Sequence, residues 1–185
     1  ALVRKAGQQG AKVSCDVAVH HLHLSEVDIG YFDSHARFDP PLRSGADRAA
    51  LREAVGEGLA AVCSDHSPVD EDGKLLPFAE AVPGATGLEL LLPLTLKLAE
   101  EMKIPLVAAL ARVTCDPAAV LGIDAGTLTV GKPADICVFD AHEPWRVLPD
   151  ALKSQGKNTP FIGYEMAGRV SATLVGGRLV FARQG

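Results

Sequence analysis

An acidic side chain stands directly after a short apolar run, at a place where parallel α/β folds put their chemistry. Residues 59–63, with the sequence LAAVC, lead straight into Ser64, Asp65 and His66. Such a run is typical of a buried strand, and active sites of these folds form past the carboxyl ends of the strands. A carboxylate there can bind a metal ion and take a proton from an attacking water. A turn or capping role for Asp65 explains the same residues equally well.

Three histidines lie near the end of a second predicted strand. His20, His21 and His23 lie in the sequence VHHLHL, where the two-residue period of a strand places His21 and His23 on one face and His20 on the other. Two histidines on one face could bind zinc, but no third ligand has a suitable spacing. Clustering by chance at the end of a strand is therefore the favoured interpretation.

Composition and charge exclude several other classes of function. The 185 residues are 48% hydrophobic and 22% charged, which is typical of a globular protein. The 18 Lys and Arg residues against 23 Asp and Glu residues leave a net charge of −5, so no basic surface is expected to bind nucleic acid. No apolar stretch approaches the roughly 20 residues needed to cross a bilayer. We therefore expect a small-molecule substrate and neither a nucleic-acid nor a membrane partner.

The cysteines are too far apart for a disulfide framework or a zinc knuckle. Cys15, Cys63, Cys115 and Cys137 include no C-x-x-C pair, and each lies beside apolar residues. We interpret them as reduced, buried thiols of a cytoplasmic protein.

Helical and strand patterns alternate along the first two thirds of the chain. The strand pattern of residues 11–24 and the apolar run 59–63 stand next to predicted helices, with a long irregular loop at 25–41 between them. The predicted helices cover residues 1–10, 44–58, 85–102, 105–113 and 116–122, with a break near Pro93 in the third. This alternation predicts an α/β fold with parallel strands.

The composition changes at Gly126. The segments GTLTVGKPADICVFD and GRVSATLVGGRLVFARQG are short alternating strands with glycine turns, which predict a small β-subdomain. We predict that residues 1–122 form the C-terminal strand–helix units of a (β/α)₈ TIM-type barrel and that residues 123–185 form the appended subdomain with an irregular connection. A whole barrel needs about 250 residues, so the barrel is incomplete in this chain, whose start without Met suggests a fragment.

Several segments, in this order, resemble the C-terminal portion of the dihydroorotase family of amidohydrolases. They are DPPLRS, SDHSP, DGKLLPF, PGATGLELLLPL, TCDPAAVLG, GTLTVGKPADICVFD and NTPFIGYEMAGRVSATLVGGRLV. Together they extend over nearly all of the chain.

The resemblance implies a metal-dependent amidohydrolase that interconverts carbamoyl aspartate and dihydroorotate in pyrimidine biosynthesis, with zinc as the cofactor. Asp65 takes the place of the family's metal-linked aspartate and general base. Pro83 and Gly84 take the place of a loop that contacts the substrate. The family's other metal ligands, including its two later histidines, are expected before Ala1, so this chain by itself is expected to be inactive.

Two departures from the family pattern favour an alternative. Val69 stands where the family has a substrate-contacting histidine, and an alkyl side chain cannot donate a hydrogen bond. Asp39 replaces a substrate-contacting asparagine, and at about 4 Å with an effective dielectric near 20 two like charges cost roughly 4 kcal/mol. The alternative is a catalytically impaired dihydroorotase-like paralogue of proteobacteria, a structural partner of aspartate transcarbamoylase. A homo-oligomer is compatible with both interpretations, and hydrolysis of another cyclic amide, such as a hydantoin, is a third.

Overall fold

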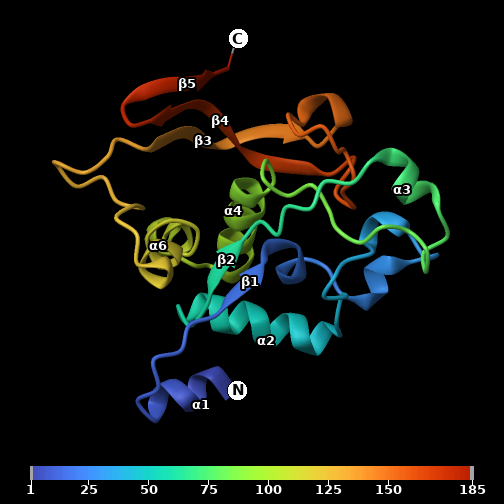
Figure 1. Ribbon diagram of the computed structural model, residues 1–185, viewed down its shortest axis with the longest axis horizontal. Coiled ribbons are helices and arrows are strands. Elements are labelled where there is room, and N and C mark those ends of the chain that lie inside the picture. Colours follow the sequence, from blue (N-terminus) through green and yellow to red (C-terminus); the bar gives the residue numbers. More distant parts are fainter. Residues whose placement is uncertain (1, 184–185) are drawn as a thin grey trace.

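A short parallel sheet and a helix form the centre of the computed structural model, which describes residues 2–183 (Figure 1). Strands β1 (Asp16–Ala18) and β2 (Ala61–Cys63) pair in parallel, with Ala18 opposite Cys63. Helix α4 (Leu91–Met102) lies between this pair and the C-terminal strands. The parallel pairing brings the carboxyl ends of both strands to the same edge.

The connection between these strands contains the predicted helix with clear start and stop signals. Helix α2 (Gly45–Gly56) begins at the cap residue Ser44, whose hydroxyl accepts a hydrogen bond from the Asp47 N–H at 3.1 Å. After the helix, Gly58 takes a φ of +78° and the chain turns into β2. This confirms the helix predicted at 44–58.

The strand predicted at residues 11–24 is much shorter in the structure. After Ala18 the chain turns into the 3-10 helix η1 (Val19–Leu22), which buries both His20 and His21. The alternation of faces expected for a strand therefore does not apply to these histidines. The remaining short helices are α1 (Leu2–Gln8), η2 (Glu26–Ile29), η3 (Ser34–Ala36), α3 (Glu71–Leu75) and η4 (Pro149–Ala151).

The break predicted near Pro93 is wrong. Helix α4 begins at Leu91, so Pro93 lies in its first turn, where a missing N–H and a fixed φ cost nothing. Helices α5 (Leu106–Ala111) and α6 (Cys115–Leu121) follow close to the predicted positions.

The C-terminal strands form an antiparallel sheet in the order β3 (Ile136–Arg146), β4 (Glu165–Val175) and β5 (Arg178–Ala182). Gly176 and Gly177, both with positive φ, make the tight turn between β4 and β5 that the sequence predicts. Residues 126–131, by contrast, form no strand.

One hydrophobic core connects the two parts of the chain. Val17, Leu22 and Leu94 belong to the same buried cluster as Phe161 and Met166 from the C-terminal part. Among the described residues, no helix has the length and apolar character required to span a bilayer.

Candidate active site

Asp65 lies two residues beyond the end of strand β2. Its backbone φ is +45°, in the left-handed region that most side chains avoid and aspartate tolerates. Its side chain remains 37% exposed. Sparsely populated backbone conformations of this kind concentrate at functional sites, which makes Asp65 the starting point for building the site.

His20 occupies the equivalent position beyond strand β1. Because Ala18 pairs with Cys63, the residues two places further along each chain, His20 and Asp65, emerge side by side. The imidazole Nε2 of His20 lies 3.6 Å from the Oδ2 atom of Asp65. The structure therefore joins an aspartate and a histidine that are far apart in the sequence.

The His20 ring is buried and has a free nitrogen. Its side chain is 4% exposed and stacks on the Phe38 ring with 4.0 Å between ring centroids. Among the described residues, its Nε2 atom has no hydrogen-bond partner. Burial, and then the neighbouring His21, lower the pKa of His20 to about 3, so the ring is neutral at physiological pH. A neutral imidazole with an unused nitrogen can bind a cation.

Asp39, predicted to contact the substrate, lies on the loop that covers this histidine pair. It directly follows Phe38, and its side chain is exposed. Nε2 of His21 lies within hydrogen-bonding distance, 3.2 Å, of the Pro40 carbonyl oxygen, which attaches the loop to η1. The structure thus places Asp39 next to a residue that contacts His20.

The predicted substrate loop meets the Asp65 loop edge to edge. His66 pairs with Ala85 in a parallel bridge, and Ser67 N–H donates to the Ala85 carbonyl oxygen at 2.8 Å. Gly84 has a φ of +119°, and a Cβ atom there would lie 2.5 Å from the Cβ atom of Ser67. Only glycine fits this approach, and Pro83 lies exposed beside it.

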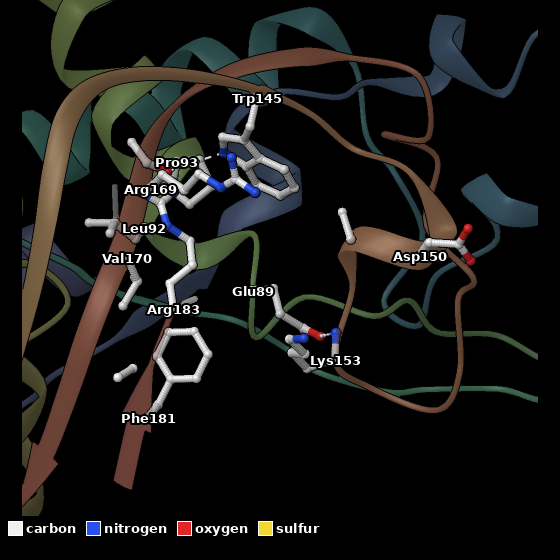
Figure 2. A pocket seen from close by; sticks show the side chains of 13 residues that line it. Glu89, Leu92, Pro93, Trp145, Asp150, Lys153, Arg169, Val170, Phe181 and Arg183 are labelled. Atoms are coloured by element: carbon white, nitrogen blue, oxygen red, sulfur yellow. Dashed lines mark hydrogen bonds between the residues drawn. The ribbon is translucent and has the colours of Figure 1, made fainter. Parts of the chain in front are cut away.

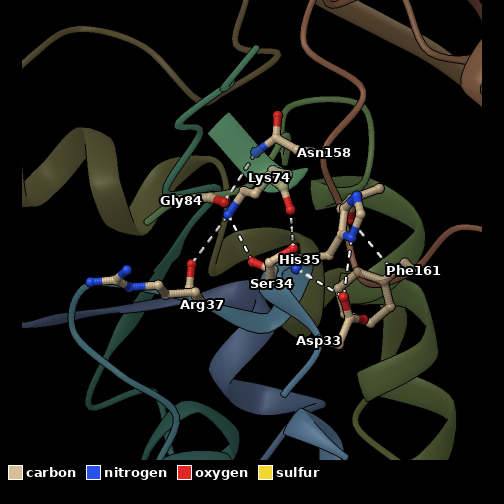
Figure 3. A network of polar contacts seen from close by, with 9 residues as sticks. Asp33, Ser34, His35, Arg37, Lys74, Gly84, Asn158 and Phe161 are labelled. Atoms are coloured by element: carbon tan, nitrogen blue, oxygen red, sulfur yellow. Dashed lines mark hydrogen bonds and ion pairs between the residues drawn. The ribbon is translucent and has the colours of Figure 1, made fainter. Parts of the chain in front are cut away.

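A cavity of about 500 Å³ lies beside Val69, and Lys74 lines it. The Lys74 side chain is 4% exposed, and its Nζ donates to the carbonyl oxygens of Ser34 at 3.1 Å and Arg37 at 3.5 Å (Figure 3). Burial, and then the charge of Arg37, lower the pKa of Lys74 to about 8. Lys74 therefore fastens α3 to the loop before Asp39.

A second cavity, of about 670 Å³, lies away from Asp65 (Figure 2). Its walls come from the start of α4 and from the outer sheet, including Trp145, Arg169 and Phe181. No residue of segments 18–23 or 64–69 lines it, so it is separate from the candidate active site.

The chemistry of His20 and Asp65 fits two ligands of a metal centre. Imidazole nitrogen and carboxylate oxygen are common zinc donors, and the unused His20 Nε2 points at the carboxylate. Burial and the nearby Asp16 carboxylate raise the pKa of the neighbouring Cys63 thiol to about 12, which favours the thiol over the metal-binding thiolate. Within residues 2–183, no group of three or more His, Cys, Asp or Glu side chains could hold a metal ion.

Comparison with known proteins identifies the family. Residues 5–180 match the model of the amidohydrolase family. The chain belongs to the amidohydrolase family. Members of this family are generally metal-dependent, in agreement with the donor types found at Asp65 and His20.

Among amidohydrolases of known name, dihydroorotases are similar to this chain over almost its whole length. The dihydroorotase of Geobacter metallireducens is 41% identical over 183 residues, which cover 98% of this chain and 43% of the relative. That of Geobacter sulfurreducens is 43% identical, with the same coverage. The resemblance to the C-terminal portion of dihydroorotases is therefore confirmed, and the chain spans less than half the length of these relatives.

Solved amidohydrolase structures confirm the predicted fold class. The L-hydantoinase of Arthrobacter aurescens superposes with a TM-score of 0.87 at 28% identity, covering 97% of this chain and 41% of that protein. A dihydroorotase of Saccharomyces cerevisiae superposes with a TM-score of 0.70 at 18% identity, covering 87% of this chain and 43% of that protein. The chain has the fold of the C-terminal part of an amidohydrolase barrel with its appended β-structure.

Sequence reasoning missed His20 as a partner of Asp65. The assumed strand periodicity placed His20 on the opposite face from His21 and His23, whereas all of residues 19–22 lie in a 3-10 helix. No sequence signal marked this pairing, because the end of β1 at Ala18 and its register with Cys63 are seen only in the structure.

Proposed function

We propose that the protein is a zinc-dependent cyclic amide hydrolase of the dihydroorotase type, which interconverts carbamoyl aspartate and dihydroorotate in pyrimidine biosynthesis. The observation that carries the proposal is the juxtaposition of Asp65 with the buried, unpartnered Nε2 atom of His20 at the ends of two parallel strands. The similarity to dihydroorotases of two Geobacter species supports this activity over other amide hydrolyses.

Each site residue has a role in this proposal. His20 and Asp65 would hold the zinc ion together with further ligands. Zinc in such sites polarises the amide carbonyl and favours ionisation of the attacking water. Asp65, whose carboxylate is partly exposed, accepts the proton of that water and returns it to the amide nitrogen as the ring opens. Asp39, Pro83 and Gly84 contact the substrate.

Two features of the same site favour the second candidate function, an inactive partner of aspartate transcarbamoylase. Val69 stands where the family resemblance places a hydrogen-bond-donating histidine, and its alkyl side chain cannot donate to an anionic substrate. Asp39 is exposed and has no arginine or lysine paired with it within 4.0 Å among the described residues, so its negative charge repels a dicarboxylate. Both side chains weaken substrate binding rather than the chemical step.

We further propose a cytoplasmic protein with a small-molecule substrate, acting as a homo-oligomer or in a complex with aspartate transcarbamoylase. All four cysteines are free thiols, in agreement with a reducing compartment. Their predicted burial is wrong, because Cys137 is exposed and the other three are only partly buried.

The two candidates are separated by metal content and turnover of the full-length protein. The enzyme hypothesis predicts bound zinc and hydrolysis of dihydroorotate. In the variant Asp65→Asn, turnover should fall by roughly a thousandfold or more, because the amide cannot take up the proton. The exposed Asp72→Asn is the matched control and should retain activity.

Unchanged turnover in Asp65→Asn would remove this residue from the mechanism. A metal-free protein without turnover that co-elutes with aspartate transcarbamoylase in size-exclusion chromatography would instead establish the second candidate.

A further inference from the structure

We propose that Asn158 is a positioning residue that holds the Asp65 loop, residues 64–69, against the substrate loop, residues 83–87. The inference rests on the proposed function, because it assigns the substrate contact to Gly84. Asn158 itself lies far along the chain, between η4 and β4. Its role follows from the backbone groups to which it binds.

The side-chain amide of Asn158 binds both loops at once. Its Nδ2 donates to the Gly84 carbonyl oxygen at 3.0 Å (Figure 3). The same Nδ2 is 3.4 Å from the Ser67 carbonyl oxygen. Its Oδ1 accepts a hydrogen bond from the Val69 N–H at 2.8 Å. One planar amide thus connects the chain on either side of Pro68 to the glycine that contacts the substrate.

The backbone of the same residue makes a further connection to the substrate loop. The Asn158 carbonyl oxygen accepts a hydrogen bond from the Thr86 N–H at 2.7 Å. The Thr86 hydroxyl lies 2.5 Å from the Gly156 carbonyl oxygen and 3.3 Å from Oδ1 of Asn158. Asn158 is 4% exposed and Thr86 is 1% exposed, so water does not compete for these hydrogen bonds.

The two loops and the Asn158 segment approach so closely that the substrate loop and the Asn158 segment both require glycine where they meet the Asp65 loop. A Cβ atom at Gly156 would lie 2.8 Å from Cβ of Pro68 and 3.0 Å from the Val69 nitrogen. At Gly87 it would overlap the Ser64 carbonyl oxygen. Because so little free space remains, a change in the Asn158 hydrogen bonds must displace backbone rather than side chains.

The segment before Asn158 is itself held in place, which allows it to act as a fixed point. The Glu89 carboxylate accepts hydrogen bonds from the backbone N–H groups of Lys153 at 2.7 Å and Ser154 at 2.6 Å. The Lys157 ammonium donates to the carbonyl oxygens of Leu152 at 2.8 Å and Ser154 at 2.6 Å. Glu89 lies just after the substrate loop, so the segment and this loop share an anchor.

Only an amide of this length meets the requirements at position 158. The site needs a donor toward Gly84 and Ser67 and an acceptor for Val69 N–H, and asparagine provides both. Aspartate has the same shape, but its second oxygen would face two carbonyl oxygens without a proton to share. The variant Asn158→Asp therefore removes the donor and keeps the volume.

The expected consequence is a change in substrate binding rather than in the chemical step. Asp65 is placed by strand β2 and its register with β1, which Asn158 does not touch. Gly84 and Val69 are held by Asn158 directly. In full-length Asn158→Asp we expect the KM for dihydroorotate to rise about tenfold, with kcat changed less than threefold and zinc content unchanged.

The control is Thr159→Val, which alters the adjacent residue. Thr159 is 2% exposed, and its hydroxyl accepts a 3.4 Å hydrogen bond from the Phe161 N–H, away from both loops. This variant should lose some stability and keep the wild-type KM. A merely structural role for Asn158 predicts the same behaviour for both variants, and that result would overturn the proposal.

Amide hydrogen exchange tests, independently of activity, whether Asn158 holds the two loops together. In Asn158→Asp, peptides covering residues 64–69 and 83–87 should exchange faster than in wild type, whereas Thr159→Val should leave them unchanged. If the wild-type protein has no turnover, the proposed function fails, but hydrogen exchange still shows whether Asn158 holds the two loops together. Unaltered protection of both loops in Asn158→Asp would disprove this role.

Discussion

Two adjacent buried histidines have different surroundings although both are almost fully covered. His20 is 4% exposed and His21 is 7% exposed. Nε2 of His21 has a partner, the Pro40 carbonyl oxygen, whereas Nε2 of His20 has none in the described part of the chain. A buried polar atom without a partner costs about 1–3 kcal/mol of stability. Such a cost is expected where the free nitrogen serves another purpose, such as binding a cation beside Asp65.

The histidine pair therefore provides a matched test of metal binding. In the full-length protein, His20→Gln should weaken zinc affinity at least about tenfold, because an amide is a poor zinc ligand of similar volume. His21→Gln should leave the affinity unchanged, since His21 binds a carbonyl oxygen instead. Competition with a chelator measures both values. Equal zinc affinity in His20→Gln and wild type would contradict the assignment.

At the scale of elements, the site depends on how closely short segments approach one another. The loop after β2 and the loop before α4 are joined by the bridge between His66 and Ala85, and the imidazole Nδ1 of His66 accepts a hydrogen bond from the Gly87 N–H at 3.1 Å. These contacts position Gly84 relative to Asp65 without a long strand. Small residues are essential where these two loops touch, because their backbones are in direct contact.

Gly87→Ala tests this approach. The added methyl group would overlap the Ser64 carbonyl oxygen, so we expect a loss of about 1–3 kcal/mol in the free energy of unfolding. Gly45→Ala, in the first turn of α2 with nothing within 4 Å, should cost nothing. Urea denaturation of the full-length variants provides the comparison. Identical midpoints for both would show that the loops can separate freely.

The junction between η1 and α4 should make stability depend on pH. Nε2 of His23 donates to the Leu94 carbonyl oxygen at 2.9 Å, and burial lowers the pKa of His23 to about 4, although this hydrogen bond partly opposes the shift. Between pH 6.5 and about 4, His23 therefore binds a proton in the unfolded chain but not in the folded chain. The free energy of unfolding consequently falls as the pH drops through this window.

His23→Gln keeps a donor toward Leu94 and removes the titration. The decrease in unfolding free energy from pH 7 to pH 4 should be smaller in this variant than in wild type, by on the order of 3 kcal/mol at most. Chemical denaturation at several pH values measures the difference. Parallel pH profiles for the two proteins would show that His23 does not titrate as inferred.

At the scale of the whole molecule, the C-terminal part shares a core with the parallel strands. Phe161 is 3% exposed and lies edge-on to His23, with 6.5 Å between ring centroids. Leu96 of α4 also meets Gly168 of β4. The outer sheet is thus packed onto α4, which in turn contacts η1, the helix that carries His20. Asn158 extends from the same C-terminal part to the loops.

Phe161→Ala should therefore destabilise both parts together. Loss of this buried ring is expected to cost about 3–5 kcal/mol, and hydrogen exchange should increase in β1 and β2 as well as in β3 and β4. Phe32→Ala, at a position 72% exposed, is the control and should change neither. Faster exchange confined to the C-terminal strands would show that the two parts unfold independently.

Local sequence patterns were sufficient to predict those elements whose signals lie within a few residues. Ser44 and Asp47 mark the start of α2, Gly176 and Gly177 mark the β4–β5 turn, and the apolar run before Asp65 marks β2. Capping, turn geometry and burial depend on neighbours along the chain, so they can be recognised without coordinates.

The tertiary structure alone decided which distant residues meet. The chain leaves β1 as a 3-10 helix because packing against α2 and α4 outweighs the strand pattern, and this brings His20 rather than His21 to Asp65. The contacts of Asn158 join positions up to 91 residues apart. Such long-range contacts depend on strand register and on packing of the whole core, neither of which is encoded in any single short segment.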